Sequence, residues 1–229
     1  MTLGKYRPDI DGLRAVSILA VVLYHAHVPG FEAGYLGVDV FFVISGFLIT
    51  GQLLREAELT GTLNLANFYA RRVRRLAPAF VAMAGGTTLL AFLCLSPLVE
   101  QGDFGGALSR SAVFYYNIAV WRGAYDYGAP DAQQQVLMHT WSLGVEEQFY
   151  LVWPWICLAA VRIGRPLLAF SALVLLSFAG AGWTLPGDPG AVFFLLPFRV
   201  WELGLGACVA VRPWEISTRG ASALTLGGS

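Results

Sequence analysis

Arginine, histidine and acidic side chains occur inside apolar stretches of this sequence, where they could do acid–base or anion-binding chemistry. Arg14 and His25 are eleven residues apart. That is close to three turns of an α-helix, so both would lie on one face, about 16 Å apart along the axis. An imidazole ordinarily titrates at about pH 6.5, which suits a general base at neutral pH. Ionisable groups in hydrocarbon are costly and commonly mark function. His25 is therefore a candidate catalytic base; the alternative is a histidine that only ends its helix.

An acid stands near the start of the next apolar stretch. Asp39 follows the segment GYLGV (34–38) and is expected near the outer end of a helix, at about the level of His25. A carboxylate beside an imidazole orients the ring and balances its charge. Asp39 is thus a candidate partner of His25. Capping the helix or facing water are the alternatives.

Four arginines crowd the segment FYARRVRRLAP (68–78). They are Arg71, Arg72, Arg74 and Arg75. The guanidinium fork donates two hydrogen bonds at once to a phosphate. The run is therefore interpreted as an anion site for a phosphorylated cofactor. Ordinary topology and anchoring to lipid headgroups are the alternative.

Two adjacent carboxylates, Glu146 and Glu147, lie in the stretch HTWSLGVEEQFYL (139–151). Neighbouring residues of a helix diverge by roughly 100°. At most one of the two is therefore expected to point squarely into a helix bundle, where it could act as a base or hold the histidine. The other interpretation is that both carboxylates only complement the helix dipole.

A further charged pair is predicted in the stretch FRVWELGLGA (198–207). Arg199 and Glu202 are three residues apart, so they would share one helix face. They could form a charge-compensated buried pair, or they could line a polar substrate cavity.

The elements that must position these residues are membrane helices. The chain has 229 residues, of which 56% are hydrophobic and 13% charged, whereas soluble domains have about 25% charged residues. A span needs about 20 mostly apolar residues. Spans are predicted near 12–28, 37–55, 76–98, 144–162, 166–184 and 192–211. The shorter segment 105–121 is predicted to be a re-entrant or interfacial helix. Residues 1–229 are thus expected to form one all-α domain, a polytopic transmembrane helical bundle.

The cationic residues predict the orientation of this bundle. If 105–121 does not cross, most arginines fall on one side, which the positive-inside rule makes cytoplasmic. We predict a multi-pass protein of the cytoplasmic membrane with its N-terminus and the loop 56–75 inside. The apolar segment from Ala221 resembles the start of another span. The chain is therefore expected to be the N-terminal portion of a longer membrane domain.

Other classes of function find little support in the sequence. The three cysteines stand alone in apolar runs, so no metal site is predicted. The formal net charge is zero, which gives no indication of a nucleic-acid partner. P-loop, G-x-G-x-x-G and G-x-S-x-G motifs are absent from the sequence. The lipid bilayer is the predicted partner.

Five stretches together resemble the acyltransferase 3 family of membrane acyltransferases. They are RPDIDGLRAVSILAVVLYH (7–25), GYLGVDVFFVISGFLIT (34–50), FYARRVRRLAP (68–78), HTWSLGVEEQFYLVWP (139–154) and FRVWELGLGA (198–207). Their identity, order and spacing all agree with the family, and they span most of the chain. Family members typically have more spans than this chain provides.

The resemblance implies O-acylation, often O-acetylation, of a cell-surface carbohydrate or lipid-linked sugar. Such acceptors include lipopolysaccharide and peptidoglycan. The implied donor is cytoplasmic acyl-coenzyme A, a substrate rather than a permanently bound cofactor. The family's functional histidine maps onto His25, its arginine onto Arg14, its R-x-x-R motif onto Arg71/Arg74 or Arg72/Arg75, and its carboxylate onto Glu146 or Glu147.

The predicted mechanism places coenzyme A phosphates on Arg71–Arg75 and threads the pantetheine arm toward His25. His25 would take the proton of the attacking sugar hydroxyl while Glu147 or Asp39 holds its tautomer. A covalent acyl intermediate on His25 is left open. Two rival interpretations are a membrane transporter of acyl groups or glycolipids and an inactive truncated membrane module. A transporter would move its substrate without forming an ester.

Overall fold

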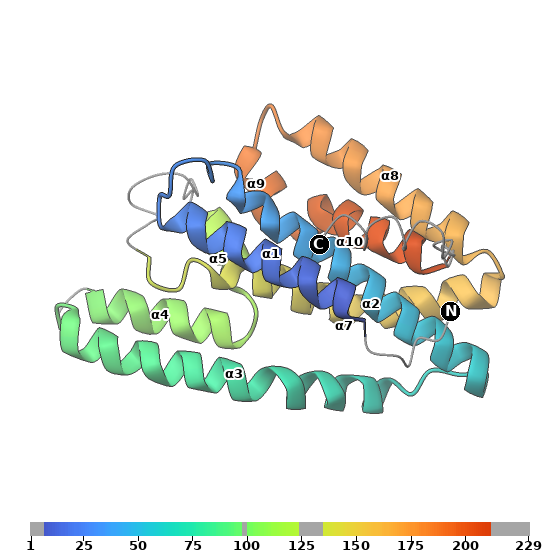
Figure 1. Cartoon of the computed structure of the whole chain (residues 1–229), viewed down its shortest axis with the longest axis horizontal. Helices are drawn as coiled ribbons and strands as arrows, with labels where there is room; N and C mark the ends of the chain where they lie inside the picture. The colour runs from blue at the N-terminus through green and yellow to red at the C-terminus, as the bar shows by residue number, and fades with distance from the viewer. Residues whose placement is uncertain (1–6, 98–99, 124–134, 212–229) are drawn as a thin grey trace, which may run out of the picture.

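The computed structural model of the chain describes residues 7–97, 100–123 and 135–211 (Figure 1). Within these ranges every regular element is a helix, which confirms the prediction of an all-α fold. In chain order the helices are α1 (Pro8–His25), the 3₁₀ turn η1 (Gly34–Leu36), α2 (Gly37–Thr60), α3 (Leu65–Cys94), α4 (Glu100–Ala112), α5 (Tyr116–Arg122), α7 (Thr140–Ile163), α8 (Pro166–Thr184), α9 (Pro189–Phe194) and α10 (Leu196–Val211). The predicted further span from Ala221 lies outside the described residues.

Several helices begin and end at residues that suit those positions. The Asn64 side chain accepts a hydrogen bond from the backbone N–H of Asn67 at 2.9 Å and so caps the start of α3. Pro166 occupies the first turn of α8, where its missing N–H costs nothing. Gly61 and Gly164 follow α2 and α7 with φ of 72° each, a left-handed conformation that glycine adopts without strain.

Four helical segments of the described residues are long and apolar enough to cross a membrane. They are Gly34–Thr60, Leu65–Cys94, Pro166–Thr184 and Pro189–Val211. The other two predicted spans coincide with α1 and α7, which are less apolar because each carries ionisable residues. Six spans therefore remain a prediction. Arg14 and His25 in α1 and Glu146 and Glu147 in α7, all candidate site residues, are among the ionisable groups that lower the hydropathy of these two helices.

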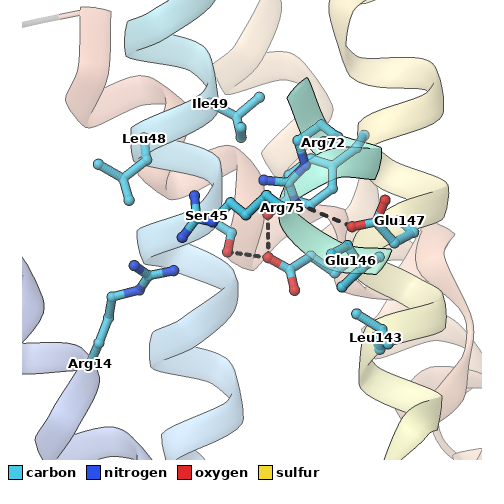
Figure 2. Close-up of a pocket in the computed structure, with 11 residues that line it drawn as sticks. Arg14, Ser45, Leu48, Ile49, Arg72, Arg75, Leu143, Glu146 and Glu147 are labelled. Carbon is cyan, nitrogen blue, oxygen red and sulfur yellow. Dashed lines mark hydrogen bonds and ion pairs between the residues drawn. The ribbon is translucent and has the colours of Figure 1, made fainter. Parts of the chain in front are cut away.

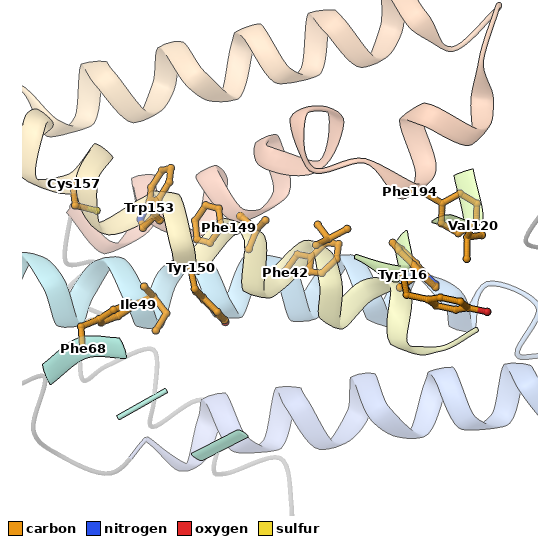
Figure 3. Packing of buried hydrophobic residues seen from close by; sticks show 14 of the residues in the cluster. Phe42, Ile49, Phe68, Tyr116, Val120, Phe149, Tyr150, Trp153, Cys157 and Phe194 are labelled. Atoms are coloured by element: carbon orange, nitrogen blue, oxygen red, sulfur yellow. The ribbon is translucent and has the colours of Figure 1, made fainter. Parts of the chain in front are cut away.

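The core is built around α7, whose buried face repeats every four residues. Trp141, Val145, Phe149, Trp153 and Cys157 are each at most 2% exposed. This spacing keeps them on one side of the helix. Figure 3 shows how aromatic rings continue along this face, with the Phe149 and Trp153 rings stacked at 4.5 Å between centroids. Around α7, α3 and α4 lie along one side of the bundle and α8 along the other (Figure 1).

Helices α2 and α10 pack closely against each other. Gly46 lies against the backbone of Leu203, and Gly206 lies against the backbone of Val43. A Cβ at either glycine would overlap the facing carbonyl oxygen. Small residues allow membrane helices to approach this closely. The position of α2 is therefore tied to α10, although the two are far apart in sequence.

Two breaks in the helical backbone are stabilised by side-chain amides. The predicted helix 105–121 is two helices, because the chain turns between α4 and α5, where Phe114 has φ of 54°. Gln148 Nε2 donates to the Phe114 carbonyl at 2.7 Å, and Asn117 Nδ2 donates to the Phe194 carbonyl at the end of α9 at 3.0 Å. Irregular backbone at membrane depth needs such partners. The break at Phe114 had no sequence signal, since left-handed positions usually hold glycine or asparagine.

Candidate functional site

A cavity of about 200 Å³ lies between α1, α2, α3 and α7 (Figure 2). Its lining residues are Arg14 from α1, Ser45, Leu48 and Ile49 from α2, Arg72, Arg75 and Leu76 from α3, and Leu143, Glu146, Glu147 and Tyr150 from α7. Three arginines and two glutamates give the lining one surplus positive charge. Five of the residues singled out from the sequence thus meet in one place.

The two adjacent glutamates line the same cavity but have different partners. Glu147 Oε1 accepts from the Arg72 guanidinium at 3.1 Å, and both side chains are more than four-fifths buried. Glu146 Oε1 instead accepts from two hydroxyl groups, those of Ser45 on α2 and Tyr150 on α7. Figure 2 shows the two carboxylates pointing to different sides. One glutamate therefore neutralises an arginine, while the other is held by neutral donors.

Ser45 and Tyr150 are site residues that sequence reasoning missed. Ser45 lies 101 residues before Glu146, so no local pattern connects them. Tyr150 did carry a signal, because it follows Glu146 by four residues and so shares its helix face. The Arg72 guanidinium also lies over the Tyr150 ring, with its carbon 3.5 Å from the ring centroid, within the range of a cation–π contact.

The two possible R-x-x-R pairs lie differently with respect to the cavity. Arg72 and Arg75 line the cavity, whereas Arg71 and Arg74 do not. Arg71 faces an open depression of about 850 Å³ at the α2–α3 turn, where it pairs with Glu56 at 3.5 Å. Arg74 is exposed. Arg72 and Arg75 are therefore the pair that could hold an anion together with Arg14.

His25 lies on the last turn of α1, outside this cavity. Its Nδ1 lies 2.8 Å from the carbonyl oxygen of Val21. Because a carbonyl only accepts, Nδ1 carries the proton of this hydrogen bond, and in the neutral ring Nε2 is the basic nitrogen. Arg14 and His25 share α1 at the expected separation of three turns.

A second histidine, His139, precedes α7 and was not among the predicted site residues. Burial lowers the pKa of His139 below its ordinary value, and its electrostatic interaction with nearby His25 lowers the pKa further. A backbone hydrogen bond at Val136 opposes both effects. His139 thus lies close to the predicted base, in surroundings that favour its neutral form.

Asp39, the predicted partner of His25, forms an ion pair with Arg199. Gly37 packs against the backbone of Ser17, so the start of α2 lies beside the middle of α1. Asp39 Oδ1 accepts from Arg199 Nη1 at 3.1 Å. The role of Asp39 as a partner of His25 stays a prediction, and its ion pair with Arg199 was not expected from the sequence.

Arg199 is the centre of a three-residue charged cluster. It donates to Asp39 and, at 2.5 Å, to Glu202, which confirms the i,i+3 pairing. Its Nε donates to the carbonyl of Phe193 at the end of α9 at 2.9 Å. Glu202 is 1% exposed, and its Oε2 has no hydrogen-bond partner among the described residues. Neither Arg199 nor Glu202 lines the cavity described above.

The helical bundle and its internal charged cavity define a multi-pass membrane protein. A family model described as an acyltransferase domain matches residues 7–227. The chain therefore belongs to this acyltransferase family, which confirms the resemblance seen in the sequence.

Three comparisons with curated proteins agree with this assignment. The chain is 34% identical to a protein named peptidoglycan O-acetyltransferase OatA from Listeria monocytogenes, over 93% of this chain and 35% of that protein. It is 33% identical to the putative peptidoglycan O-acetyltransferase YrhL of Bacillus subtilis, over 90% of this chain and 33% of that protein. It is 34% identical to a putative O-acetyltransferase of Staphylococcus aureus, over 90% of this chain and 35% of that protein. The chain spans about a third of the length of these relatives. No solved structure matches it.

Proposed function

We propose that this chain forms the membrane part of an O-acetyltransferase. It would move an acetyl group from cytoplasmic acyl-coenzyme A to a hydroxyl of a cell-surface carbohydrate such as peptidoglycan. The observation that carries the proposal is the cavity in which Arg14 of α1 meets Arg72 and Arg75 of α3. The names of the relatives support acetyl as the acyl group and a glycan as the acceptor.

The charge of the cavity favours an anionic donor. Glu147 balances Arg72, whereas Arg75 makes no ion pair within the part of the chain that the structure describes. Arg14 is only 3.9 Å from Asp11, at the limit of an ion pair. Arg14 and Arg75 are thus left to bind phosphate, which arginine does with paired hydrogen bonds. Acyl-coenzyme A carries its phosphates at one end and its thioester at the other.

His25 is assigned the role of general base at the outer end of α1. Its separation from Arg14, about 16 Å, would be spanned by the pantetheine arm of the donor. The acceptor oxygen attacks the thioester carbon, the C–S bond breaks as the ester C–O bond forms, and His25 Nε2 takes the hydroxyl proton. That proton then passes to the departing sulfur, so the products are an ester and free coenzyme A.

The proposal is tested by replacing His25 in cells that carry the protein. His25→Ala should reduce base-labile acetate on surface glycans to the background of cells without the gene, since general-base catalysis contributes about 10²–10⁴-fold. His27→Asn is the matched control, because His27 has φ of 54° and asparagine tolerates that conformation. Undiminished acetylation at equal protein abundance would remove His25 from the chemistry. Transport of acetyl groups without ester formation would favour a transporter instead.

A further inference from the structure

Tyr150 makes two different contacts with the charged residues of the cavity. It is 2% exposed and lies one helical turn after Glu146 on α7. Its hydroxyl donates a hydrogen bond to Glu146 Oε1. The Arg72 guanidinium lies over the face of its ring, with its carbon 3.5 Å from the ring centroid. Tyr150 therefore contacts the Glu146 carboxylate through its hydroxyl and the Arg72 guanidinium through its ring.

These contacts keep Glu146 and Arg72 from neutralising each other. Opposite charges attract strongly in a low-dielectric interior, yet Glu146 forms no ion pair with any cation of the described residues. Both neutral hydroxyls donate to its Oε1, so Oε2 has no hydrogen bond from the described residues. Glu146 thus keeps a carboxylate oxygen that can accept a further hydrogen bond. Arg72 is fixed in turn by Glu147 and by the ring, and its buried Nε has no hydrogen-bond partner among the described residues.

We propose that Tyr150 is the positioning residue of this cavity. It holds Glu146 ready to accept hydrogen bonds from the donor substrate while it seats Arg72 for an anionic group. The pantetheine arm of an acyl-coenzyme A carries amide N–H and hydroxyl donors, which a carboxylate held by neutral groups accepts well. This inference rests on the proposed function, because it assigns Glu146 and Arg72 to the same donor. Ser45 assists from α2 by holding the same carboxylate oxygen.

Substitutions that remove the two parts of the side chain separately test this role. Tyr150→Phe removes only the hydroxyl. It should lower kcat for acetyl transfer from acetyl-coenzyme A to chito-oligosaccharide about ten- to a hundredfold in detergent-solubilised protein, as expected for a lost hydrogen bond to a charged group. Tyr150→Leu also removes the ring under Arg72, so it should raise the KM for acetyl-coenzyme A as well. The double variant Tyr150→Phe/Glu146→Gln should be no slower than Glu146→Gln alone, because both changes remove the same interaction.

Tyr69→Phe is the matched control. The Tyr69 hydroxyl also joins α3 to α7, by donating to the Leu151 carbonyl at 2.8 Å, but Tyr69 does not line the cavity. Loss of the Tyr69 hydroxyl should leave kcat and KM within about twofold of the wild-type values, since a neutral hydrogen bond outside the site contributes only to stability. If Tyr150→Phe acted only by destabilising the protein, its kcat per folded molecule should stay as close to the wild-type value as that of Tyr69→Phe. Thermal stability of all variants is measured alongside.

Binding of coenzyme A to the purified protein, measured by calorimetry, separates this inference from the proposed function. Tyr150→Leu should weaken binding about tenfold or more, whereas Tyr69→Phe should not change it. If the wild-type protein binds coenzyme A and forms the ester while Tyr150→Phe behaves like Tyr69→Phe, or if the double variant is slower than Glu146→Gln alone, the positioning role is wrong. If the wild-type protein neither binds coenzyme A nor forms the ester, the proposed function is wrong and this inference is wrong with it.

Discussion

Two groups of charged residues lie within this bundle, and they differ in how their charges are balanced. The cavity between α1, α2, α3 and α7 holds three arginines and two glutamates, and hydroxyl groups hold one of the glutamates. The cluster of Asp39, Arg199 and Glu202 has two acids on one guanidinium, which also binds a backbone carbonyl. The cavity has space and a surplus of cations for a ligand. The Arg199 cluster instead uses its one guanidinium to join α2, α9 and α10.

This difference shows that a charge buried in a membrane bundle does not by itself mark a reaction site. Both groups looked alike in the sequence, as ionisable residues in apolar stretches. They are distinguished by whether a cavity adjoins them and whether their hydrogen-bonding capacity is used within the protein. The Arg199 cluster is therefore interpreted as a structural cross-link and the cavity as a binding site.

The largest expected effect comes from removing the shared cation of the cross-link. Arg199→Leu leaves Asp39 and Glu202 without their partner and the Phe193 carbonyl without its donor. Breaking a buried ion pair from one side costs about 3–5 kcal/mol, so the purified protein should melt at a much lower temperature. Arg74→Leu, at an exposed position, is the control. Wild-type stability of Arg199→Leu would contradict the interpretation as a cross-link.

A smaller loss of stability is expected where α2 contacts α10. Gly46→Ala places a methyl group on the Leu203 carbonyl, so the two helices must separate. Such overpacking costs about 1–3 kcal/mol, and thermal denaturation measures it. Gly85→Ala in α3, where a Cβ meets no atom within 4 Å, should be neutral or slightly stabilising, because alanine favours helix more than glycine does. An equal response at both positions would mean that the contact does not constrain α2.

The smallest free-energy change is expected in the cavity, but it should appear in substrate binding. Arg75→Gln removes a cation that lines the cavity, so the KM for acetyl-coenzyme A should rise about tenfold, which corresponds to about 1.4 kcal/mol, with little change in thermal stability. Arg74→Gln removes the same charge from the neighbouring residue, which is also exposed but does not line the cavity, and should leave KM within about twofold. Equal effects at both residues would indicate general electrostatic attraction rather than a defined site.

The sequence predicted the helices better than it predicted how they contact one another. The predicted span 166–184 coincides with α8, Pro166–Thr184, because proline and a long apolar run define it locally. The family resemblance also grouped Arg14 with the arginines of 71–75 and with Glu146 or Glu147, although it left open which arginine pair and which glutamate. Local patterns of this kind are carried by neighbouring residues, so they are visible in a single chain.

Contacts between distant helices could not be predicted in the same way. Ser45 reaches Glu146 across 101 residues, and Asp39 reaches Arg199 across 160. The sequence placed Asp39 at about the level of His25, but it did not predict that Asp39 pairs with Arg199 or that Gly37 packs on Ser17. Such registers depend on the shapes of two helix surfaces together, which no single stretch of sequence contains.

The glycine contact between α2 and α10 has a consequence for how the protein is assembled during synthesis. Gly46 directly follows Ser45, one of the two residues that hold Glu146. The backbone against which Gly46 rests, at Leu203, leaves the ribosome more than 150 residues later. The contact between α2 and α10 can therefore form only after α10 has been made. The Ser45 hydroxyl next to Gly46 thus belongs to a helix whose final packing waits for residues made after the lining of the cavity.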